Sequence, residues 1–125
     1  MCGKAEDRGL SGASLGGLIS TYLAFQRPDV WGYVGSQSAS LFWNSDRMIA
    51  RAGEDPKVPV RFYLDHGCPN DNCVENQQMN TALMQKGYEV THVEVGGAKH
   101  EWSFWRARLP QMLEYFRAGR PATCQ

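Results

Sequence analysis

Short apolar segments typical of β-strands alternate with amphipathic segments typical of helices along the whole chain. The expected strands cover residues 8–12, 31–36, 58–64 and 89–95. The expected helices follow them, at residues 15–26, 46–52, 74–86 and 105–116. Strands that are joined by helical crossovers pair in parallel, and the helices then cover the sheet. We therefore predict an α/β fold with a mostly parallel sheet and helices on both faces.

Residues with strong backbone preferences mark where these helices end or change direction. The run Arg27-Pro28-Asp29 ends the first helix, because proline cannot continue it. Gly87 can take the left-handed conformation that caps the third helix. Pro110 is expected to bend the last helix or to begin its second segment.

The chain is 125 residues long, with 42% hydrophobic and 21% charged residues and 13 residues of each charge sign. This length and composition fit one globular domain over residues 1–125 and give no indication of nucleic-acid binding. No apolar run approaches the roughly 18 residues that span a bilayer, and the N-terminus lacks the apolar core of a signal peptide. We expect a soluble domain without membrane partners, and its compartment is left open.

The segment Gly-Ala-Ser-Leu-Gly at residues 12–16 has the Gly-x-Ser-x-Gly pattern of a nucleophile elbow and lies between an expected strand and an expected helix. A serine at such a sharp turn needs small neighbours, and we expect side chains at Gly12 and Gly16 to collide with the adjoining strand and helix. The turn raises Ser14 Oγ above the sheet and directs the backbone N–H of Leu15 at a developing oxyanion. Without a base and an acid downstream, Ser14 would be a turn serine that caps the helix.

His100 is the candidate general base, because it directly follows the expected strand at residues 89–95. In a hydrolase with such an elbow the chain order is serine, acid and then histidine, with the histidine in a loop beyond the last strand. An imidazole there can take the proton of Ser14 and later give it to the leaving alkoxide. His92 lies inside the strand and His66 adjoins the preceding one, so we interpret both as structural.

Three carboxylates, Asp65, Asp71 and Glu75, lie at or beyond the end of the strand at residues 58–64 and are candidates for the acid. We choose Asp71, because it lies several residues past the strand, in a loop from which a carboxylate can reach His100. Asp65 is close enough to the strand end to be a turn or cap residue. The alternative for Asp71 is a simple Asx turn.

Cys68 and Cys73 flank the turn-rich run Pro-Asn-Asp-Asn, so they form either a small local disulfide or two unpaired thiols. The cysteines do not have the paired spacing of a zinc site, and no metal site is expected.

Several large aromatic side chains either pack in the core, which is their commoner role at such spacings, or line a site for an apolar substrate group. They are Trp31, Tyr33, Phe42, Trp43, Trp102 and Trp105. Among them, we assign Trp43 and Trp102 to the substrate-binding surface.

These residues resemble the putative esterase family, which includes esterase D and the enterochelin esterases. The matching segments run along nearly the full chain: Gly-Ala-Ser-Leu-Gly-Gly at 12–17, Arg-Pro-Asp-Val-Trp-Gly at 27–32, Ser-Gln-Ser-Ala-Ser at 36–40 followed by Trp43, and Gly-Ala-Lys-His-Glu-Trp-Ser-Phe-Trp at 97–105. The last segment is similar to the family's Gly-Gly-His-x-x-x-x-Trp ending, whose histidine is catalytic and corresponds to His100. The family's acid follows a Gly-rich turn, here residues 67–71, which supports Asp71. The inserted cysteines depart from the usual shorter turn and leave Asp65 and Glu75 open.

The resemblance implies hydrolysis of a carboxylic ester through an acyl-enzyme on Ser14, without a metal or organic cofactor. The expected partner is therefore a small-molecule ester, and substrates in the family range from siderophore trilactones and thioesters to feruloyl, acetyl and simple acyl esters. Two alternatives stay open. The chain is an inactive hydrolase-like fragment that acts as a binding module, or it is an acyltransferase that uses the same three residues.

The resemblance also implies that the chain is the C-terminal half of an α/β-hydrolase catalytic domain that lacks the N-terminal strands. In that fold, several strands and the loop with the second oxyanion donor precede the elbow, whereas here only residues 1–13 do. Losing one oxyanion donor costs on the order of 10²- to 10³-fold in kcat, so we expect this chain alone to be weakly active or inactive. We expect the strand at residues 8–12 to be a bare edge that pairs with a second copy or with a separate N-terminal half.

Overall fold

The computed structural model describes residues 3–120, in which four strands and four helices alternate after a 3-10 turn (Ala5–Asp7). The strands are β1 (Gly9–Ala13), β2 (Tyr33–Gln37), β3 (Arg61–Cys68) and β4 (Val90–Gly96). The helices are α1 (Leu15–Gln26), α2 (Trp43–Glu54), α3 (Cys73–Lys86) and α4 (Trp102–Ala118). Within these residues, no helix combines the length and the apolar character that a bilayer crossing requires.

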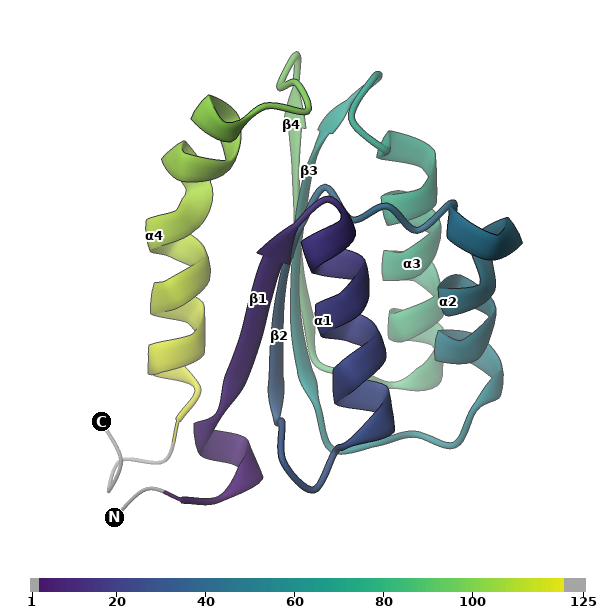
Figure 1. The fold of residues 1–125 in the computed structure, drawn as a ribbon, viewed down its shortest axis with the longest axis vertical. Helices are drawn as coiled ribbons and strands as arrows, with labels where there is room; N and C mark the ends of the chain where they lie inside the picture. Colours follow the sequence, from purple (N-terminus) through teal and green to yellow (C-terminus); the bar gives the residue numbers. More distant parts are fainter. Residues whose placement is uncertain (1–2, 121–125) are drawn as a thin grey trace.

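The strands form one parallel sheet in the order β1-β2-β3-β4, with β1 and β4 at its edges (Figure 1). Each strand pairs in parallel with the one that follows it, and every connection between them contains a helix, which is the crossover that parallel pairing needs. The register places Gln37 beside Ala13 on one side and beside Asp65 on the other. Because all strands are parallel, their carboxyl ends lie at the same end of the sheet, which is where α/β folds place their chemistry.

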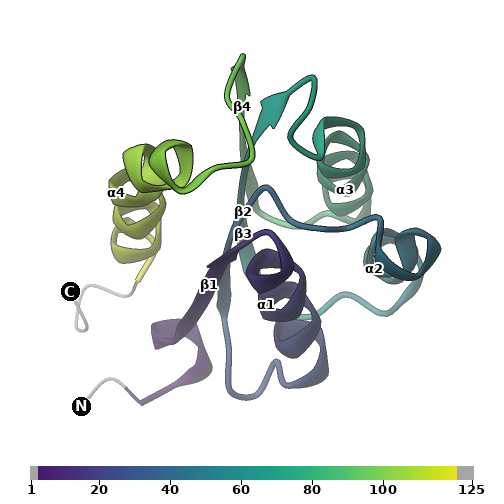
Figure 2. The same cartoon turned by 45° about the horizontal axis from the view of Figure 1, so that its top comes forward.

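Helices cover both faces of the sheet, as the alternating pattern predicts: α1, α2 and α3 lie on one face and α4 on the other (Figures 1 and 2). The strands and the first three helices enclose the larger core, which includes Ala24, Phe25, Val34, Leu41, Met48, Phe62, Leu64, Met79, Leu83 and Tyr88. A smaller core of Tyr33, Tyr63 and Met112 lies between the sheet and α4. β2 is buried at every position, which is typical of a central parallel strand.

β3 begins and ends later than the predicted strand at residues 58–64. Pro59 has no N–H for a ladder hydrogen bond, so the start of the predicted segment lies outside the sheet. At the other end, β4 pairs with β3 as far as Cys68. Asp65 and His66 therefore lie within an interior strand, fully buried, and not beyond its end.

Buried polar contacts fix α4 to the sheet. Arg108 Nη2 donates to Asp65 Oδ1 at 2.9 Å, and both side chains are almost completely enclosed. Gln37 Nε2 donates to the backbone carbonyl of Trp105 at 3.0 Å. The helix is continuous across Pro110, so this proline does not begin a second segment.

Candidate active site

Ser14 lies at the sharp turn between β1 and α1. Its φ of 60° and ψ of −121° are unusual for an L-residue, and such conformations persist only where surrounding contacts hold them. Here the N–H of Ser14 donates to the carbonyl of Gln37 at 2.8 Å, and the carbonyl of Ser14 accepts from the N–H of Ser40 at 3.1 Å. The end of β2 and the loop after it therefore hold the serine at the carboxyl edge of the sheet.

Of the two motif glycines, Gly12 is the one at which a side chain does not fit. A Cβ on Gly12 would lie 2.5 Å from the backbone C and O of Gly16, so the elbow could not close. A Cβ on Gly16 would meet nothing within 4 Å in the described part of the chain, so the predicted collision at Gly16 is wrong. The close approach of α1 to β2 occurs one residue later, where a Cβ on Gly17 would lie 2.7 Å from Ser36 Oγ.

His100 connects Ser14 to a carboxylate through its two ring nitrogens. It lies in the loop between β4 and α4, with Nε2 2.8 Å from Ser14 Oγ and Nδ1 2.7 Å from Asp71 Oδ1. With its proton on Nδ1, His100 donates to Asp71, and Nε2 accepts from the serine hydroxyl. The structure therefore brings Ser14, His100 and Asp71 together in one hydrogen-bonded chain, although they come from three separate loops.

Asp71 is fully buried and accepts hydrogen bonds on both carboxylate oxygens. While Oδ1 accepts from His100, Oδ2 accepts from the hydroxyl of Ser38 at 2.6 Å and from the N–H of Gly67 at 2.7 Å. A buried carboxylate is tolerated when its oxygens are paired in this way, and the donors also fix its orientation. Asp71 is thus a rigid partner for the half-exposed imidazole of His100.

A disulfide between Cys68 and Cys73 closes the loop that carries Asp71. Their Cα atoms are 5.0 Å apart, within the usual range for a bridged pair. Of the two alternatives that the sequence leaves open, the structure has the bridge. It joins the end of β3 to the first residue of α3, so Asp71 lies inside a short covalent ring.

The alternative acids, Asp65 and Glu75, make no hydrogen bond or ion pair with His100 within residues 3–120. Asp65 lies inside β3, so its interpretation as a turn or cap residue is wrong. Its carboxylate accepts from the side chains of Gln37, Tyr63 and Arg108. These contacts make Asp65 part of the packing between the sheet and α4, while Glu75 lies in the first turn of α3.

Ser38 is a residue of the site to which the sequence assigned no role. Its buried hydroxyl donates to Asp71 Oδ2 and accepts from Trp105 Nε1 at 2.9 Å. Its positive φ of 49° turns the chain directly after β2. In the sequence, the feature that could have pointed to Ser38 is the Ser-rich run at residues 36–40, but this run does not tell which serine faces Asp71.

A hollow of about 530 Å³ opens over Ser14 and His100, and its other walls are Leu15, Ser40, Phe42, Asn70 and Asn72. Ser40 Oγ lies 3.1 Å from Ser14 Oγ. Leu15 is the first residue of α1, and the first N–H groups of a helix have no acceptor within that helix. The N–H of Leu15 and the positive end of the helix dipole are therefore suited to face an anion here.

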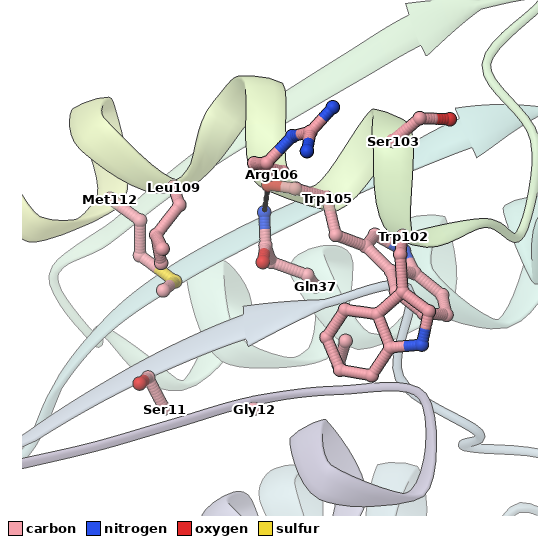
Figure 3. Close-up of a pocket in the computed structure, with 10 residues that line it drawn as sticks. Ser11, Gly12, Gln37, Trp102, Ser103, Trp105, Arg106, Leu109 and Met112 are labelled. Carbon is pink, nitrogen blue, oxygen red and sulfur yellow. Dashed lines mark hydrogen bonds between the residues drawn. The ribbon is translucent and has the colours of Figure 1, made fainter.

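The predicted substrate-binding residues, Trp43 and Trp102, line two neighbouring grooves and not the hollow itself. Trp43 is 57% exposed and borders a groove of about 620 Å³ between α1 and α2. Trp102 is 77% exposed and stands at the start of α4, over a groove of about 420 Å³ beside β1 (Figure 3). Phe42 is the aromatic residue that lines the hollow, and a substrate role for the two tryptophans stays a prediction.

Trp105 is an aromatic residue of the core that also contacts the site. It is buried, and its ring meets that of His100 edge-on, with ring centroids 4.8 Å apart and an interplanar angle of 88°. Such T-shaped pairs are favourable and orient both rings. Trp105 therefore limits the rotation of the imidazole that contacts Ser14.

The remaining histidines lie outside the hydrogen-bonded chain. His66 and His92 stand on β3 and β4 with stacked rings, and their Nε2 atoms are 2.7 Å apart. The pKa of His92 is lowered, mainly by burial and to a smaller extent by the nearby His66. On the opposite side of β3, burial and then the Asp65 carboxylate raise the pKa of Tyr63, so its hydroxyl stays a neutral donor to Asp65.

The chain is similar to known esterases over nearly its whole length. The model of a family described as "Putative esterase" matches residues 2–116. The Iron(III) enterobactin esterase of Dickeya dadantii is 27% identical over 128 residues, which cover 88% of this chain and 29% of that protein. An endo-1,4-beta-xylanase/feruloyl esterase of Xylanibacter ruminicola is 25% identical over 109 residues, which cover 86% of this chain and 14% of that protein.

Solved structures agree with these sequence matches. The enterobactin esterase of Shigella flexneri, crystallised in the presence of enterobactin, superposes with a TM-score of 0.82 at 25% identity. The match covers 91% of this chain and 31% of that structure, so the chain spans less than a third of the length of these three relatives. This likeness confirms the predicted fold class, a mostly parallel sheet with helices of the α/β-hydrolase type.

Proposed function

Because this chain belongs to the Putative esterase family, we propose that it hydrolyses a carboxylic ester through an acyl-enzyme formed on Ser14. The observation that carries the proposal is the hydrogen-bonded chain from Ser14 Oγ through His100 to Asp71, with distances of 2.8 and 2.7 Å. Serine hydrolases of unrelated folds share this arrangement, in which an imidazole makes a weak alcohol nucleophilic. Enterobactin and feruloyl esters, after which two of the relatives are named, are the substrates to test first.

In the first half of the proposed reaction, Ser14 Oγ attacks the ester carbonyl while its proton passes to His100 Nε2. The carbonyl oxygen becomes an oxyanion, and the N–H of Leu15 donates a hydrogen bond to it. The tetrahedral intermediate then collapses, because His100 returns the proton to the departing alkoxide. An alcohol leaves, and the acyl group stays on Ser14 as an ester.

In the second half, a water molecule takes the place of the alcohol. His100 accepts its proton, the hydroxide attacks the acyl carbonyl, and the carboxylic acid leaves as Ser14 regains its proton. Asp71 takes no proton from His100 in either half, and its role is to hold the Nδ1 tautomer of His100 and to stabilise the imidazolium. Its contacts with Ser38 and Gly67 keep the carboxylate in position for both halves.

The proposal is tested by the hydrolysis of p-nitrophenyl acetate and of a feruloyl ester, measured by absorbance. We expect turnover by the wild-type chain and a loss of at least about 10³-fold in Ser14→Ala. Thr81→Ala is the matched control, because it removes a hydroxyl from an exposed position of α3 that lines neither the hollow nor the groove beside Trp102, and it should leave the rate unchanged.

A fluorophosphonate probe separates slow turnover from absence of the nucleophile. It should label the wild-type chain once, at Ser14, as located by peptide mass spectrometry, and should not label Ser14→Ala. If the folded chain neither turns over an ester nor reacts with the probe, the proposed chemistry is wrong and the binding-module alternative is favoured.

A further inference from the structure

A second cluster of reactive side chains lies on β3, β4 and the start of α3, outside the hydrogen-bonded chain of the candidate active site. It consists of His66, Cys68, Cys73 and Glu94, and one ligand atom from each of these residues lies within 4.8 Å of the others. His66 is fully buried, the two cysteines are partly buried and Glu94 is exposed. Imidazole, thiolate and carboxylate are the groups that bind zinc in proteins, and four of them match its tetrahedral coordination.

The hydrogen bonds of His66 prepare it for a metal. Its Nδ1 lies 2.9 Å from the carbonyl oxygen of Gly67, which can only accept, so Nδ1 carries the proton and Nε2 the lone pair. Cys68 Sγ lies 3.7 Å from Nδ1. Histidines that bind metals usually donate their second N–H to a backbone carbonyl in this way. The Nε2 atom lies 4.0 Å from Glu94 Oε1 and accepts a hydrogen bond from His92 Nε2, 2.7 Å away, which a bound cation would displace.

In the oxidised chain the two sulfur atoms are bonded to each other and cannot act as thiolates. Reduction changes this. A dithiol or a phosphine supplies two electrons and is itself oxidised, the S–S bond breaks, and each sulfur takes up one proton. The thiols then lose these protons to solvent when a metal binds.

We propose that reduction of the Cys68–Cys73 disulfide creates a tetrahedral site for a thiolate-preferring divalent cation of the zinc class. The ligands are the two thiolates, a ring nitrogen of His66 and the carboxylate of Glu94. The two thiolates and the carboxylate together carry three negative charges, more than the two positive charges of the cation, so the reduced site attracts a divalent cation. Because the ligands come from the end of β3, the start of α3 and β4, their spacing in the sequence does not indicate a zinc site.

The disulfide and the metal are two alternative closures of the same loop. Each holds Cys68 next to Cys73, and residues 69–72 between them carry the carboxylate of Asp71. The bound cation would therefore keep this loop closed in a reducing environment, where the disulfide is lost. The site does not depend on any esterase activity of the chain, and its test uses a spectroscopic measurement.

Cobalt(II) serves as the spectroscopic probe, because it takes the geometry of zinc and absorbs light. The double variant Cys2→Ser/Cys124→Ser limits the thiols to Cys68 and Cys73. After reduction with a phosphine, we expect one equivalent of Co²⁺ to produce a thiolate-to-metal charge-transfer band and the visible bands of tetrahedral cobalt, and Zn²⁺ to remove both. The same protein with its disulfide intact should give neither signal.

Two matched variants decide whether this cluster holds the metal. Glu94→Gln should weaken cobalt binding at least 10-fold, and Cys73→Ser should weaken the charge-transfer band, because it removes one of the two thiolates. Glu75→Gln, with the same charge change close to Cys73, should bind like the parent. If the reduced protein gives no tetrahedral spectrum, or if Glu94→Gln and Glu75→Gln bind cobalt equally well, the proposed site is wrong.

Discussion

Two fully buried carboxylates, Asp65 and Asp71, lie close together in the sequence and have different roles. Asp71 faces His100 at 2.7 Å, whereas Asp65 pairs with Arg108 at 2.9 Å on α4. The first contact belongs to the candidate chemistry and the second to the packing of the fold. Replacing each carboxylate should therefore change a different measured quantity.

Asp71→Asn should lower kcat/KM for ester hydrolysis by roughly 10³- to 10⁴-fold with only a small change in KM. The amide can no longer hold His100 in the Nδ1-protonated tautomer or stabilise the imidazolium. Steady-state kinetics with p-nitrophenyl acetate measure this effect. Glu75→Gln is the control, and an equal loss in both variants would argue against Asp71 as the acid.

Ser38→Ala should lower the free energy of unfolding by about 1–3 kcal/mol, because it leaves buried polar groups of Asp71 and Trp105 with one partner fewer. Urea denaturation followed by tryptophan fluorescence measures the change. Ser11→Ala, at an exposed position of β1, should stay within about 0.5 kcal/mol of the parent. Ser38 acts through Asp71, so kcat should also fall, and KM should change little.

The strand-to-helix elbow depends on one glycine and not on two. Gly12→Ala places a methyl group against the backbone of Gly16 and should disrupt the turn, with loss of both ester hydrolysis and labelling of Ser14. Gly16→Ala has free space in the described part of the chain and should raise helix stability by roughly 0.5–1 kcal/mol. Thermal unfolding and probe labelling are measured for both variants. An equal loss of stability and of labelling in Gly12→Ala and Gly16→Ala would contradict the prediction.

The contact between α4 and the sheet depends on the buried ion pair of Arg108 with Asp65. Arg108→Ala should cost about 3–5 kcal/mol of unfolding free energy, because it leaves a buried carboxylate without its counter-charge. Arg106→Ala removes the same side chain from an exposed position of α4 and should change stability by less than about 0.5 kcal/mol. Chemical denaturation measures the unfolding free energy of both variants. Similar losses in Arg108→Ala and Arg106→Ala would show that the ion pair with Asp65 does not stabilise the fold.

The molecule as a whole has one edge that combines an unpaired strand with exposed apolar side chains. β1 pairs with β2 on one side only, so its outer N–H and C=O groups have no neighbouring strand within residues 3–120. Trp102, Leu109 and Leu113 of α4 are exposed, and Figure 3 shows the first two beside Ser11 and Gly12 of β1. Such an edge favours the addition of another strand.

We therefore propose that the chain self-associates through β1 at tens of micromolar, unless a separate N-terminal segment covers this edge. Light scattering coupled to size exclusion should give a mass above 14.0 kDa that rises with concentration. Ser11→Lys, which places a charge on the outer edge, should shift the chain to monomer, whereas Thr81→Lys on α3 should not. A wild-type chain that stays monomeric at these concentrations would contradict the proposal.

Much of this architecture follows from local signals in the sequence. The sequence pattern located all four helices and three of the strands with boundaries that differ from the observed ones by at most three residues, close to the one or two residues by which boundary assignments usually vary. Gly87 caps α3 in the left-handed conformation, as predicted, because that preference is a property of glycine itself. The boundaries of β3 were less accurate, because its length depends on pairing with β4 and not on its own residues.

The amino-acid order alone established the parallel α/β arrangement, the elbow at Ser14 and the loop position of His100, because periodicity, glycine and chain order act over a few residues. Tertiary structure decided that Asp71 and not Asp65 meets His100, that Ser38 supports this carboxylate and that Gly16 has free space. These outcomes depend on distances between segments far apart in the chain. Strand register and helix packing set such distances, and no local pattern encodes them.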